Sequence, residues 1–180
     1  MSDAASSTQW RALVEAMGKL SAATSLDAAV EVIRSSARAI VQADGITFVR
    51  REGDMVRYVA EDAISPLWAG QRFPIEACIS GIAILTKQPV VIADIYADSR
   101  VPHYAYRSTF VQSMAMFPVG LDAPIAAIGA YWSRTHMIDH DAITLMTMLA
   151  RSASAVLELI DLNRTATEQE STLRRLAAAR

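Results

Sequence analysis

The sequence predicts an α+β domain in which an antiparallel sheet of five or six strands carries helices on both faces and a long helix closes the chain. Residues 10–41 and 139–180 place apolar side chains at helical spacing, whereas residues 46–132 hold short apolar or alternating runs separated by turn residues. Strands grouped between helices, instead of alternating with them, are typical of the α+β class. With 180 residues, the chain fits one domain plus an appendage.

Two helices are predicted at the N-terminus. One helical face of the first holds Trp10, Leu13, Val14, Met17 and Leu20. Thr24 can cap a second helix with Asp27 in its first turn, and the pair Asp44-Gly45 is a suitable stop. We expect both helices to pack on the sheet.

The middle of the chain has the pattern of strands. Residues 46–51 and 55–60 flank the turn Glu52-Gly53-Asp54, which predicts a hairpin. The other elements expected are an extended piece at residues 73–75, a short helix at 79–85, a strand at 89–93 and two strong strands at 113–119 and 124–132. The last two strands are apolar almost throughout, so the sheet should be covered on both faces. We expect helices on one face and the connection formed by residues 94–112 on the other.

The last predicted helix begins after Asp139 and can continue to Arg180. About 40 helical residues span about 60 Å, whereas a domain of this size is only about 40 Å across, so part of the helix should project. Its second half keeps a thin apolar seam close to heptad spacing, formed by Leu162, Ala166, Gln169, Leu173 and Leu176. The predicted organisation is an N-terminal helix (residues 1–20), a domain (21–160) and a projecting signalling helix (161–180). We expect the terminal helices to pair in a homodimer; the alternative for residues 161–180 is a frayed tail.

Composition excludes several classes of protein. The chain has 17 basic and 19 acidic residues, so nothing in its charge favours nucleic acid or an anionic membrane as a partner. The N-terminus lacks the pattern of a signal peptide, and no apolar run approaches the ~20 residues of a membrane span. We therefore expect a cytoplasmic protein. Cys78 is the only cysteine, which excludes an intrachain disulfide and a multi-cysteine zinc site.

Residues 94–112 indicate a small-molecule pocket. A chain that leaves a sheet, crosses its face and returns can enclose a ligand, and aromatic side chains with polar tips suit such a site. The candidates are Asp94, Tyr96, His103, Tyr104, Tyr106 and Arg107 in this connection, with Cys78, Met114, Met116 and Tyr131 from neighbouring elements. An alternative is that Asp98 and Arg100 tie the connection down by an ion pair and the tyrosines pack on the sheet. The sequence does not identify the ligand, and a lone histidine such as His103 is weak evidence for a metal or haem.

Cys78 allows two interpretations. A thiolate at the start of the predicted helix 79–85 would be activated by the exposed amides there, which would suit a redox switch or a thiol enzyme. A lone cysteine is more often a small buried apolar residue.

Several segments carry a family resemblance. They are Gly81-Ile82-Ala83, residues 87–94, Asp98-Ser99-Arg100, residues 113–119, residues 125–129 and the closing helix. Over residues 20–162 the chain resembles a GAF domain, a sensory module with a profilin-like sheet, and residues 77–110 resemble GAF domains that precede bacterial histidine kinases. The resemblance implies a non-catalytic regulatory domain of bacterial two-component signal transduction, which holds a ligand between the sheet and residues 94–112 and acts through its terminal helices on a histidine kinase or another output protein.

The chain departs from three specialised GAF types. Ile79 follows the cysteine where bilin-binding domains usually have histidine, and one cysteine cannot form the disulfide of free methionine sulfoxide reductases. Thr86-Lys87 stands where cyclic-nucleotide-binding domains carry an Asn-Lys pair. A further alternative is an interaction module whose pocket is filled by its own side chains.

Overall fold

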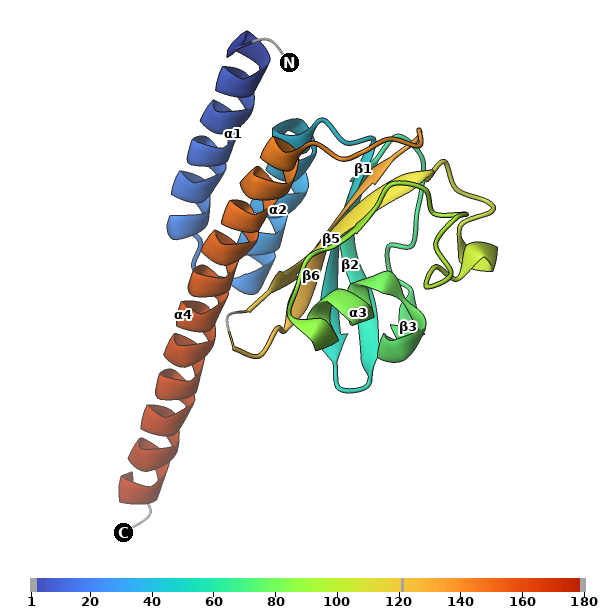
Figure 1. The fold of residues 1–180 in the computed structure, drawn as a ribbon. Coiled ribbons are helices and arrows are strands. Elements are labelled where there is room, and N and C mark those ends of the chain that lie inside the picture. Colours follow the sequence, from blue (N-terminus) through green and yellow to red (C-terminus); the bar gives the residue numbers. More distant parts are fainter. Residues whose placement is uncertain (1–2, 121, 179–180) are drawn as a thin grey trace.

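A six-stranded antiparallel sheet forms the centre of the fold. The computed structural model describes residues 3–120 and 122–178. The strands are β1 (Gly45–Glu52), β2 (Met55–Ala63), β3 (Arg72–Pro74), β4 (Val90–Ile92), β5 (Ser113–Val119) and β6 (Ala126–Trp132), in the order β3-β2-β1-β6-β5-β4. The helices are α1 (Asp3–Ser21), α2 (Leu26–Val41), α3 (Ile79–Thr86) and α4 (His140–Ala178), with short 3-10 turns at Ile75–Ala77 and His103–Ala105. The predicted fold class is confirmed: α2 and α4 lie on one face of the sheet and α3 on the other (Figure 1).

The predicted β1–β2 hairpin is confirmed. Glu52 pairs with Met55 across a turn formed by Gly53 and Asp54. Gly53 has a φ of +66°, in the left-handed region that glycine enters without steric cost. The turn residues therefore fix the register of the strands that follow.

Both predicted ends of α2 were wrong by a few residues. Ser25, not Thr24, caps the helix, since its hydroxyl accepts the N–H of Ala28 at 3.2 Å. The helix ends at Val41, and Gln42 takes the left-handed conformation instead of Gly45. Gly45 is needed elsewhere, because a Cβ there would lie 2.8 Å from the ring of Phe110.

The expectation that α1 packs on the sheet was wrong. The helix lies against α2 and α4 on the outside of the helical layer (Figure 1). Leu13 and Leu20 are buried there, and the Gln9 amide donates to the Ile40 carbonyl at 2.9 Å. Trp10 and Val14 face away, with Val14 66% exposed. The cause is that α2 and α4 already cover the sheet, so α1 forms a second layer.

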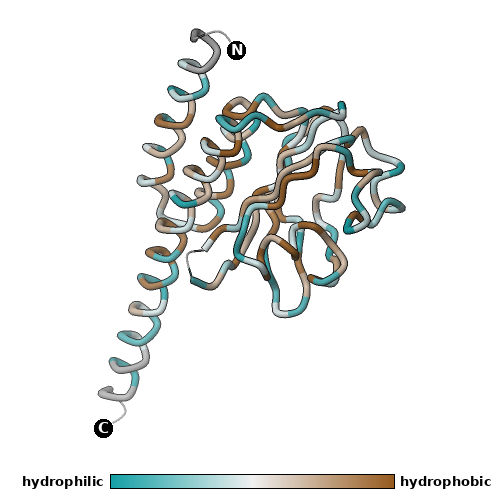
Figure 2. The backbone as a smooth tube through the Cα atoms, viewed as in Figure 1, coloured by the Kyte–Doolittle hydropathy of each residue, from teal (hydrophilic) through white to brown (hydrophobic). Residues whose placement is uncertain are grey.

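The first half of the long helix α4 packs in the domain, and its second half projects from it. Asp139 caps it as predicted, accepting the N–H of Asp141 at 3.0 Å. Leu145, Leu149 and Leu157 are buried, whereas the described side chains beyond Ile160 are exposed. Figure 2 shows the change from apolar to polar colours along the helix. The predicted seam residues Leu173 and Leu176 lie outside the side chains that the structure describes.

By length and composition alone, the segment His140–Ser171 is apolar enough to cross a membrane. Its apolar side chains nevertheless form part of the domain interior, and the core helix of a soluble protein meets the same criteria. This feature was not anticipated from runs of apolar residues, because polar residues interrupt the segment.

The sheet separates two cores. We call the side covered by α2 and α4 the helix face, and the opposite side the aromatic face. On β6, Ile128 and Trp132 point to the helix face and Ala127 and Tyr131 to the aromatic face. Both faces are buried, as the apolar strands predicted.

Candidate functional site

Four large rings meet on the aromatic face. We call Tyr58, Trp68, Tyr106 and Tyr131 the aromatic cluster. The ring centroid of Trp68 lies 5.5 Å from that of Tyr58, 4.9 Å from that of Tyr106 and 5.6 Å from that of Tyr131, each pair edge-to-face. Edge-to-face contacts at these distances are favourable because ring edges and faces carry opposite partial charge. All four side chains are buried, so the cluster forms the centre of this face.

Side-chain alternation along the strands places Tyr58 and Tyr131 in the cluster, and one glycine makes room for the Tyr131 side chain. Tyr58 on β2 and Tyr131 on β6 point to the same face, with Met114 and Met116 of β5 beside them. Gly129 lies beneath the Tyr131 side chain, since a Cβ there would be 2.6 Å from the Tyr131 hydroxyl oxygen. The missing side chain lets the phenol lie along the sheet and reach Thr47 of β1, whose hydroxyl is 2.9 Å away.

Buried polar groups run through this face. Ser80 lies 3.4 Å from the Tyr58 hydroxyl and 3.3 Å from the Cys78 sulfur. The Tyr106 hydroxyl donates to the Met114 sulfur at 3.8 Å. Together with the Thr47–Tyr131 bond, these contacts satisfy hydroxyl and thiol groups that burial removes from water.

The polar groups of the aromatic face are uncharged at neutral pH. Burial raises the pKa of Tyr58, Tyr106 and Tyr131 far above its usual range, and it also raises the pKa of the Cys78 thiol. None of the buried residues that the structure describes is acidic or basic. The site can therefore offer hydrogen bonds and ring contacts but no ion pair.

Cys78 sits at the N-terminal cap of α3 with its sulfur near the Pro74 and Ile75 carbonyl oxygens, at 3.6 and 3.7 Å. The helix is held close to this turn by Gly81, where a Cβ would lie 1.6 Å from the Ile75 carbonyl oxygen. A buried, protonated thiol is a poor nucleophile. The local geometry thus suits packing and weak hydrogen bonding.

Comparison with known proteins agrees with this architecture. The family model described as "GAF domain" matches residues 23–158, more than half of the chain. The chain belongs to the GAF domain family. No curated protein matches its sequence.

Solved structures show the same fold at low sequence identity. The GAF domain of a phosphoenolpyruvate-protein phosphotransferase from Coxiella burnetii is 12% identical with a TM-score of 0.78, covering 89% of this chain and 98% of that one. Free methionine-R-sulfoxide reductase from Neisseria meningitidis, solved with its substrate, is 17% identical with a TM-score of 0.77, covering 91% and 95%. The chromophore-binding domain of an unusual bacteriophytochrome from R. palustris is 16% identical with a TM-score of 0.72, covering 86% and 62%. At these identities the likeness concerns the fold alone.

Half of the candidates predicted for this GAF domain come together. Cys78, Tyr106, Met114, Met116 and Tyr131 are all buried in the core of the aromatic face. The connection formed by residues 94–112 was expected to enclose a hollow with them. The structure instead places the indole of Trp68 at the centre, in contact with three tyrosines.

The other five candidates lie along the outer side of the connection. Asp94 accepts the N–H of Tyr96 at 2.9 Å, and the Tyr96 ring contacts His103 at a centroid distance of 5.5 Å. Tyr104 is 74% exposed and Arg107 is also exposed. These residues shape the connection and are not part of the aromatic cluster.

The ion pair between Asp98 and Arg100 that we considered as an alternative is present, and it bridges two residues within the connection. Arg100 donates to both carboxylate oxygens of Asp98, at 2.6 to 3.2 Å, and these hydrogen bonds lower the pKa of Asp98. His103 Nε2 lies 3.1 Å from the Asp98 carbonyl oxygen. Among the residues that the structure describes, no group of three His, Cys, Asp or Glu side chains could hold a metal ion.

Four residues of the site were missed: Thr47, Tyr58, Trp68 and Ser80. Alternation within the predicted hairpin strands could have placed Thr47 and Tyr58 on one face. Trp68 lies in the irregular segment between β2 and β3, where no periodicity applies. The one available indication was a large aromatic residue inside a turn-rich segment, Ser65-Pro66-Leu67-Trp68-Ala69-Gly70.

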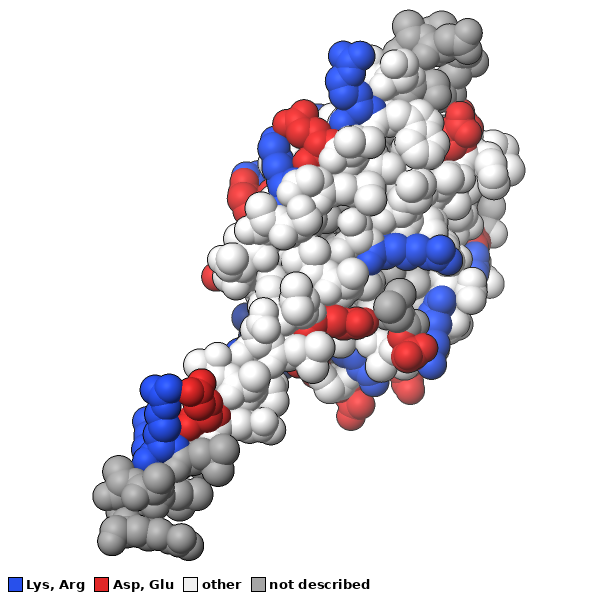
Figure 3. Space-filling model, turned by 90° about the vertical axis from the view of Figure 1, so that its left-hand side faces the viewer, with Lys and Arg blue, Asp and Glu red and all other residues white. Residues whose placement is uncertain are grey.

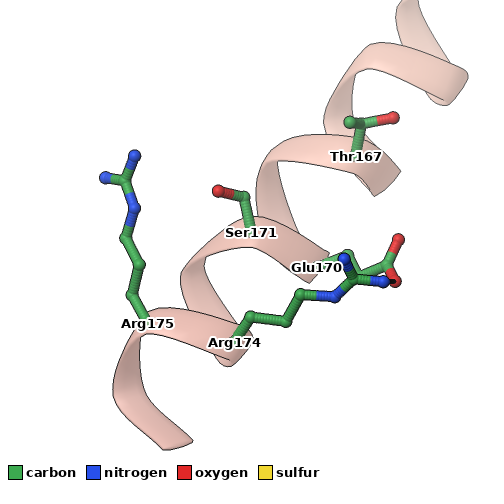
Figure 4. A pocket seen from close by; sticks show the side chains of 5 residues that line it. All are labelled: Thr167, Glu170, Ser171, Arg174 and Arg175. Carbon is green, nitrogen blue, oxygen red and sulfur yellow. Dashed lines mark hydrogen bonds and ion pairs between the residues drawn. The ribbon is translucent and has the colours of Figure 1, made fainter. Parts of the chain in front are cut away.

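A concave surface lies on the projecting part of α4 (Figure 4). It is lined by Thr167, Glu170, Ser171, Arg174 and Arg175. All five are exposed side chains of a single helix, and Arg174 pairs with Glu170 at 2.5 Å. Such a surface is solvated on most sides, so it makes a poor ligand site.

Proposed function

We propose that this GAF domain is a non-catalytic sensor that binds a small molecule on its aromatic face and passes the ligand state through its terminal helices. The output is a histidine kinase or a similar signalling protein of a bacterial, cytoplasmic two-component system. The domain works as a homodimer. The low-identity likeness to a phosphotransferase GAF domain and to a phytochrome chromophore-binding domain is compatible with a regulatory role.

The chemistry of the aromatic face supports ligand binding. Its walls are aromatic and aliphatic, and a few buried hydroxyls converge among them, which is the composition of small-molecule sites. Thr47, Tyr58 and Ser80 offer hydrogen bonds to an orienting polar edge of the ligand. The same walls hold no charged catalytic group among the described buried residues.

One contact carries the link from the site to the signalling helix. Strand β5 contributes Met114 and Met116 to the aromatic face, and the chain leaves it at Gly120. The Gly120 N–H donates to the buried Ser154 hydroxyl of α4 at 2.6 Å, and that hydroxyl donates to the Ala150 carbonyl at 2.8 Å. A ligand that shifts β5 would therefore shift α4 just before the point where it leaves the domain.

The helical layer supports self-association. Apolar side chains stay exposed on its outer side: Trp10 and Val14 on α1, and Met148, Leu159 and Leu162 on α4. Figure 3 shows this side of the molecule, with few charges over its centre. Leu159 and Leu162 are three residues apart and Met148 lies eleven residues before Leu159, so all three fall on one side of α4, as in a helix-pairing seam. A second copy of the chain is the natural partner.

Sedimentation of the full chain tests the pairing. The double substitution Leu159→Lys/Leu162→Lys should shift the protein from dimer to monomer, because two ammonium groups would have to be buried in the seam. Thr167→Lys, which adds a charge off the seam, should leave the dimer intact. A dimer unaffected by the double substitution would refute pairing through α4.

Native mass spectrometry tests ligand binding. The freshly purified dimer should carry a small molecule that is released on denaturation. Adding that compound back should change hydrogen exchange in the projecting half of α4 in the wild type, and the change should be weaker in Ser154→Ala, which removes the contact to β5. An equal change in Ser154→Ala would show that the signal does not pass through this contact.

A second candidate is a ligand-free dimerisation module. The packing of Trp68 against three tyrosines favours it, since the side chains of the domain occupy the centre of the site themselves. A thiol switch at Cys78 is less well supported, because burial raises the pKa of the thiol and so keeps it protonated. A purified dimer that releases no small molecule on denaturation would favour the ligand-free dimerisation module.

A further inference from the structure

The segment between β2 and β3 reaches into the aromatic face with only two side chains. Leu67 and Trp68 are buried, whereas Ser65, Pro66 and Ala69 are exposed. The segment therefore lies over the edge of the site as a flap, and it delivers the largest ring of the cluster. Unlike Tyr58 and Tyr131, this ring is not held by a strand.

A single carboxylate clamps the flap. Glu61, near the end of β2, accepts the N–H groups of Leu67 at 3.1 Å, Trp68 at 2.9 Å and Ala69 at 2.9 Å. Hydrogen bonds to an ionised acceptor are stronger than neutral ones. The clamp thus explains how an irregular segment holds its indole in one place.

The flap has a suitable hinge at its far end. Gly70 has a φ of +84°, and no atom lies within 4 Å of the position a Cβ would take. Its N–H donates to the Tyr58 carbonyl at 2.8 Å, and the Gln71 carbonyl accepts the Tyr58 N–H at 3.0 Å. The Gln71 N–H also donates to the Trp68 carbonyl at 2.9 Å, so opening the flap by rotation at Gly70 breaks this bond and the Gly70–Tyr58 bond, while Gln71 stays joined to β2 through the Tyr58 N–H.

Trp132 provides a comparison within the same molecule. It sits in strand β6 on the helix face and donates its indole N–H to the Gln42 carbonyl at 3.1 Å. Moving the Trp132 ring out of its place would require strand β6 to leave the sheet. Removing the Trp68 ring would require opening the clamp and the flap, and it would leave the tyrosine walls and the buried hydroxyls in place.

We propose that Trp68 is a displaceable occupant of the ligand site, and that the ligand carries a flat, uncharged aromatic or heteroaromatic ring of about the size of indole. This inference rests on the proposed function and specifies its ligand class. The walls fit such a ring because three tyrosines already hold an indole edge-to-face. A charged ring does not fit, since none of the buried side chains that the structure describes is acidic or basic and so none can offset the ring's loss of water.

Because the ligand would take the place of the Trp68 ring, ligand binding and the closed flap exclude each other. The apparent affinity for a ligand is the intrinsic affinity reduced by the fraction of molecules whose flap is open. Removing the indole should therefore tighten binding, and so should loosening the clamp. Opening also moves Trp68 into water, which gives a direct spectroscopic signal.

The test uses benzimidazole as a neutral flat probe, with benzimidazole-5-carboxylate as its charged counterpart. In a protein carrying Trp10→Phe and Trp132→Phe, benzimidazole should shift the Trp68 emission to longer wavelength and increase its quenching by acrylamide. Calorimetry should show that Trp68→Ala binds benzimidazole at least about tenfold more tightly than the wild type, since no indole has to leave. The carboxylate should bind neither protein.

A substitution in the clamp tests the same inference in a protein that keeps the Trp68 indole. Glu61→Gln leaves one carbonyl acceptor for three N–H groups, so it should raise the affinity for benzimidazole several-fold and expose Trp68 to acrylamide even without probe. Glu15→Gln is the control: Glu15 pairs with Lys19 at the surface of α1, on the other side of the sheet from the flap, and its substitution should change neither quantity.

The outcomes separate this inference from the proposed function. If Trp68→Ala binds benzimidazole but the wild type keeps its Trp68 emission unchanged at saturating probe, the site exists and the displaceable tryptophan is refuted. If neither protein binds, the ligand class is refuted, whereas a compound released in native mass spectrometry would still uphold the sensor. Equal affinities of wild type and Trp68→Ala would also overturn displacement.

Discussion

The two faces of the sheet are built from different chemistry, although the same strands supply both. The helix face is filled mainly by aliphatic side chains such as Ile33, Ile40 and Leu149 from two helices, and the strands add the rings of Phe48, Phe117 and Trp132. The aromatic face combines tyrosines with buried hydroxyl and thiol groups that bond to one another. A core made only for stability gains little from buried hydroxyls, because their hydrogen bonds mainly offset the cost of desolvation. The comparison agrees with the proposed division, in which the helix face stabilises the domain and the aromatic face binds the ligand.

The faces also differ in how their covering elements are fixed. On the helix face, α2 and α4 are long helices with caps at Ser25 and Asp139. On the aromatic face the cover consists of shorter pieces: α3, which packs on β5 and β6, the flap that carries Trp68, and residues 94–112, whose end is joined to β6 by the Gln112 N–H donating to the Trp132 carbonyl. The flap contributes only two buried side chains, so it is the piece expected to open at the lowest free-energy cost.

The strongest test of the aromatic face is Gly81, the glycine where an added Cβ would come closest to another atom. Gly81→Ala should lower the free energy of unfolding by about 4 kcal/mol or more, because the new Cβ would lie 1.6 Å from the Ile75 carbonyl oxygen and α3 would have to move. Urea denaturation followed by circular dichroism measures the change. Gly18→Ala in α1 is the control: nothing lies within 4 Å of its Cβ position, so it should stabilise the protein by up to about 1 kcal/mol. A well-tolerated Gly81→Ala would show that α3 is not anchored at this turn.

On the helix face, a cavity should cost stability without reaching the site. Leu149 is fully buried there, and Leu149→Ala should lower the free energy of unfolding by about 3 kcal/mol. In the folded protein with Trp68 as the single tryptophan, the emission maximum should stay unchanged. Leu85→Ala, at an exposed position, should change stability by less than about 0.5 kcal/mol. A shift in Trp68 emission on Leu149→Ala would break the proposed separation of the two faces.

The buried hydroxyls permit a finer test. Tyr131→Phe leaves the Thr47 hydroxyl without its partner at 2.9 Å, which should lower the free energy of unfolding by about 1–2 kcal/mol. Adding Thr47→Val to this variant should restore part of the loss, since both partners are then apolar. Tyr104→Phe should have no measurable effect at its exposed position. A double variant no more stable than Tyr131→Phe would show that the bond contributes nothing beyond packing.

Local rules in the sequence predicted most of this fold. Periodicity gave the strands of the hairpin and the two strong strands, and Gly53 and Asp139 marked a turn and a cap correctly. The errors arose where tertiary contacts decided the outcome. Gly45 offered a helix stop but was required for close packing under Phe110, and the apolar side of α1 met helices because two other helices had already covered the sheet.

The site was less predictable than the fold, for a physical reason. Met114, Met116 and Tyr131 lie on regular strands, where alternation determines the face. Tyr104 and Tyr106 are only two residues apart in an irregular connection, yet one is exposed and the other buried. Trp68 enters from a different irregular segment, held by a carboxylate seven residues earlier in the sequence. Without periodicity, no local pattern states which side chain of such a segment turns inward.

The smallest effect expected concerns the ionisation of the aromatic cluster. Burial raises the pKa of Tyr106 far above that of the unfolded chain, so the folded form keeps the phenol protonated while the unfolded form ionises near pH 10. Folding stability linked to this group is therefore complete below about pH 10 and is lost as the pH rises toward the folded pKa. The Tyr106 hydroxyl contacts only the Met114 sulfur at 3.8 Å, so Tyr106→Phe should change stability by less than about 0.5 kcal/mol at pH 7. Relative to the wild type it should then gain about 0.4 kcal/mol at pH 10 and about 1.4 kcal/mol at pH 11, as measured by urea denaturation across this range. A parallel pH dependence of the wild type and Tyr106→Phe would mean that Tyr106 reaches water in the folded state and that the aromatic face is more open than its packing indicates.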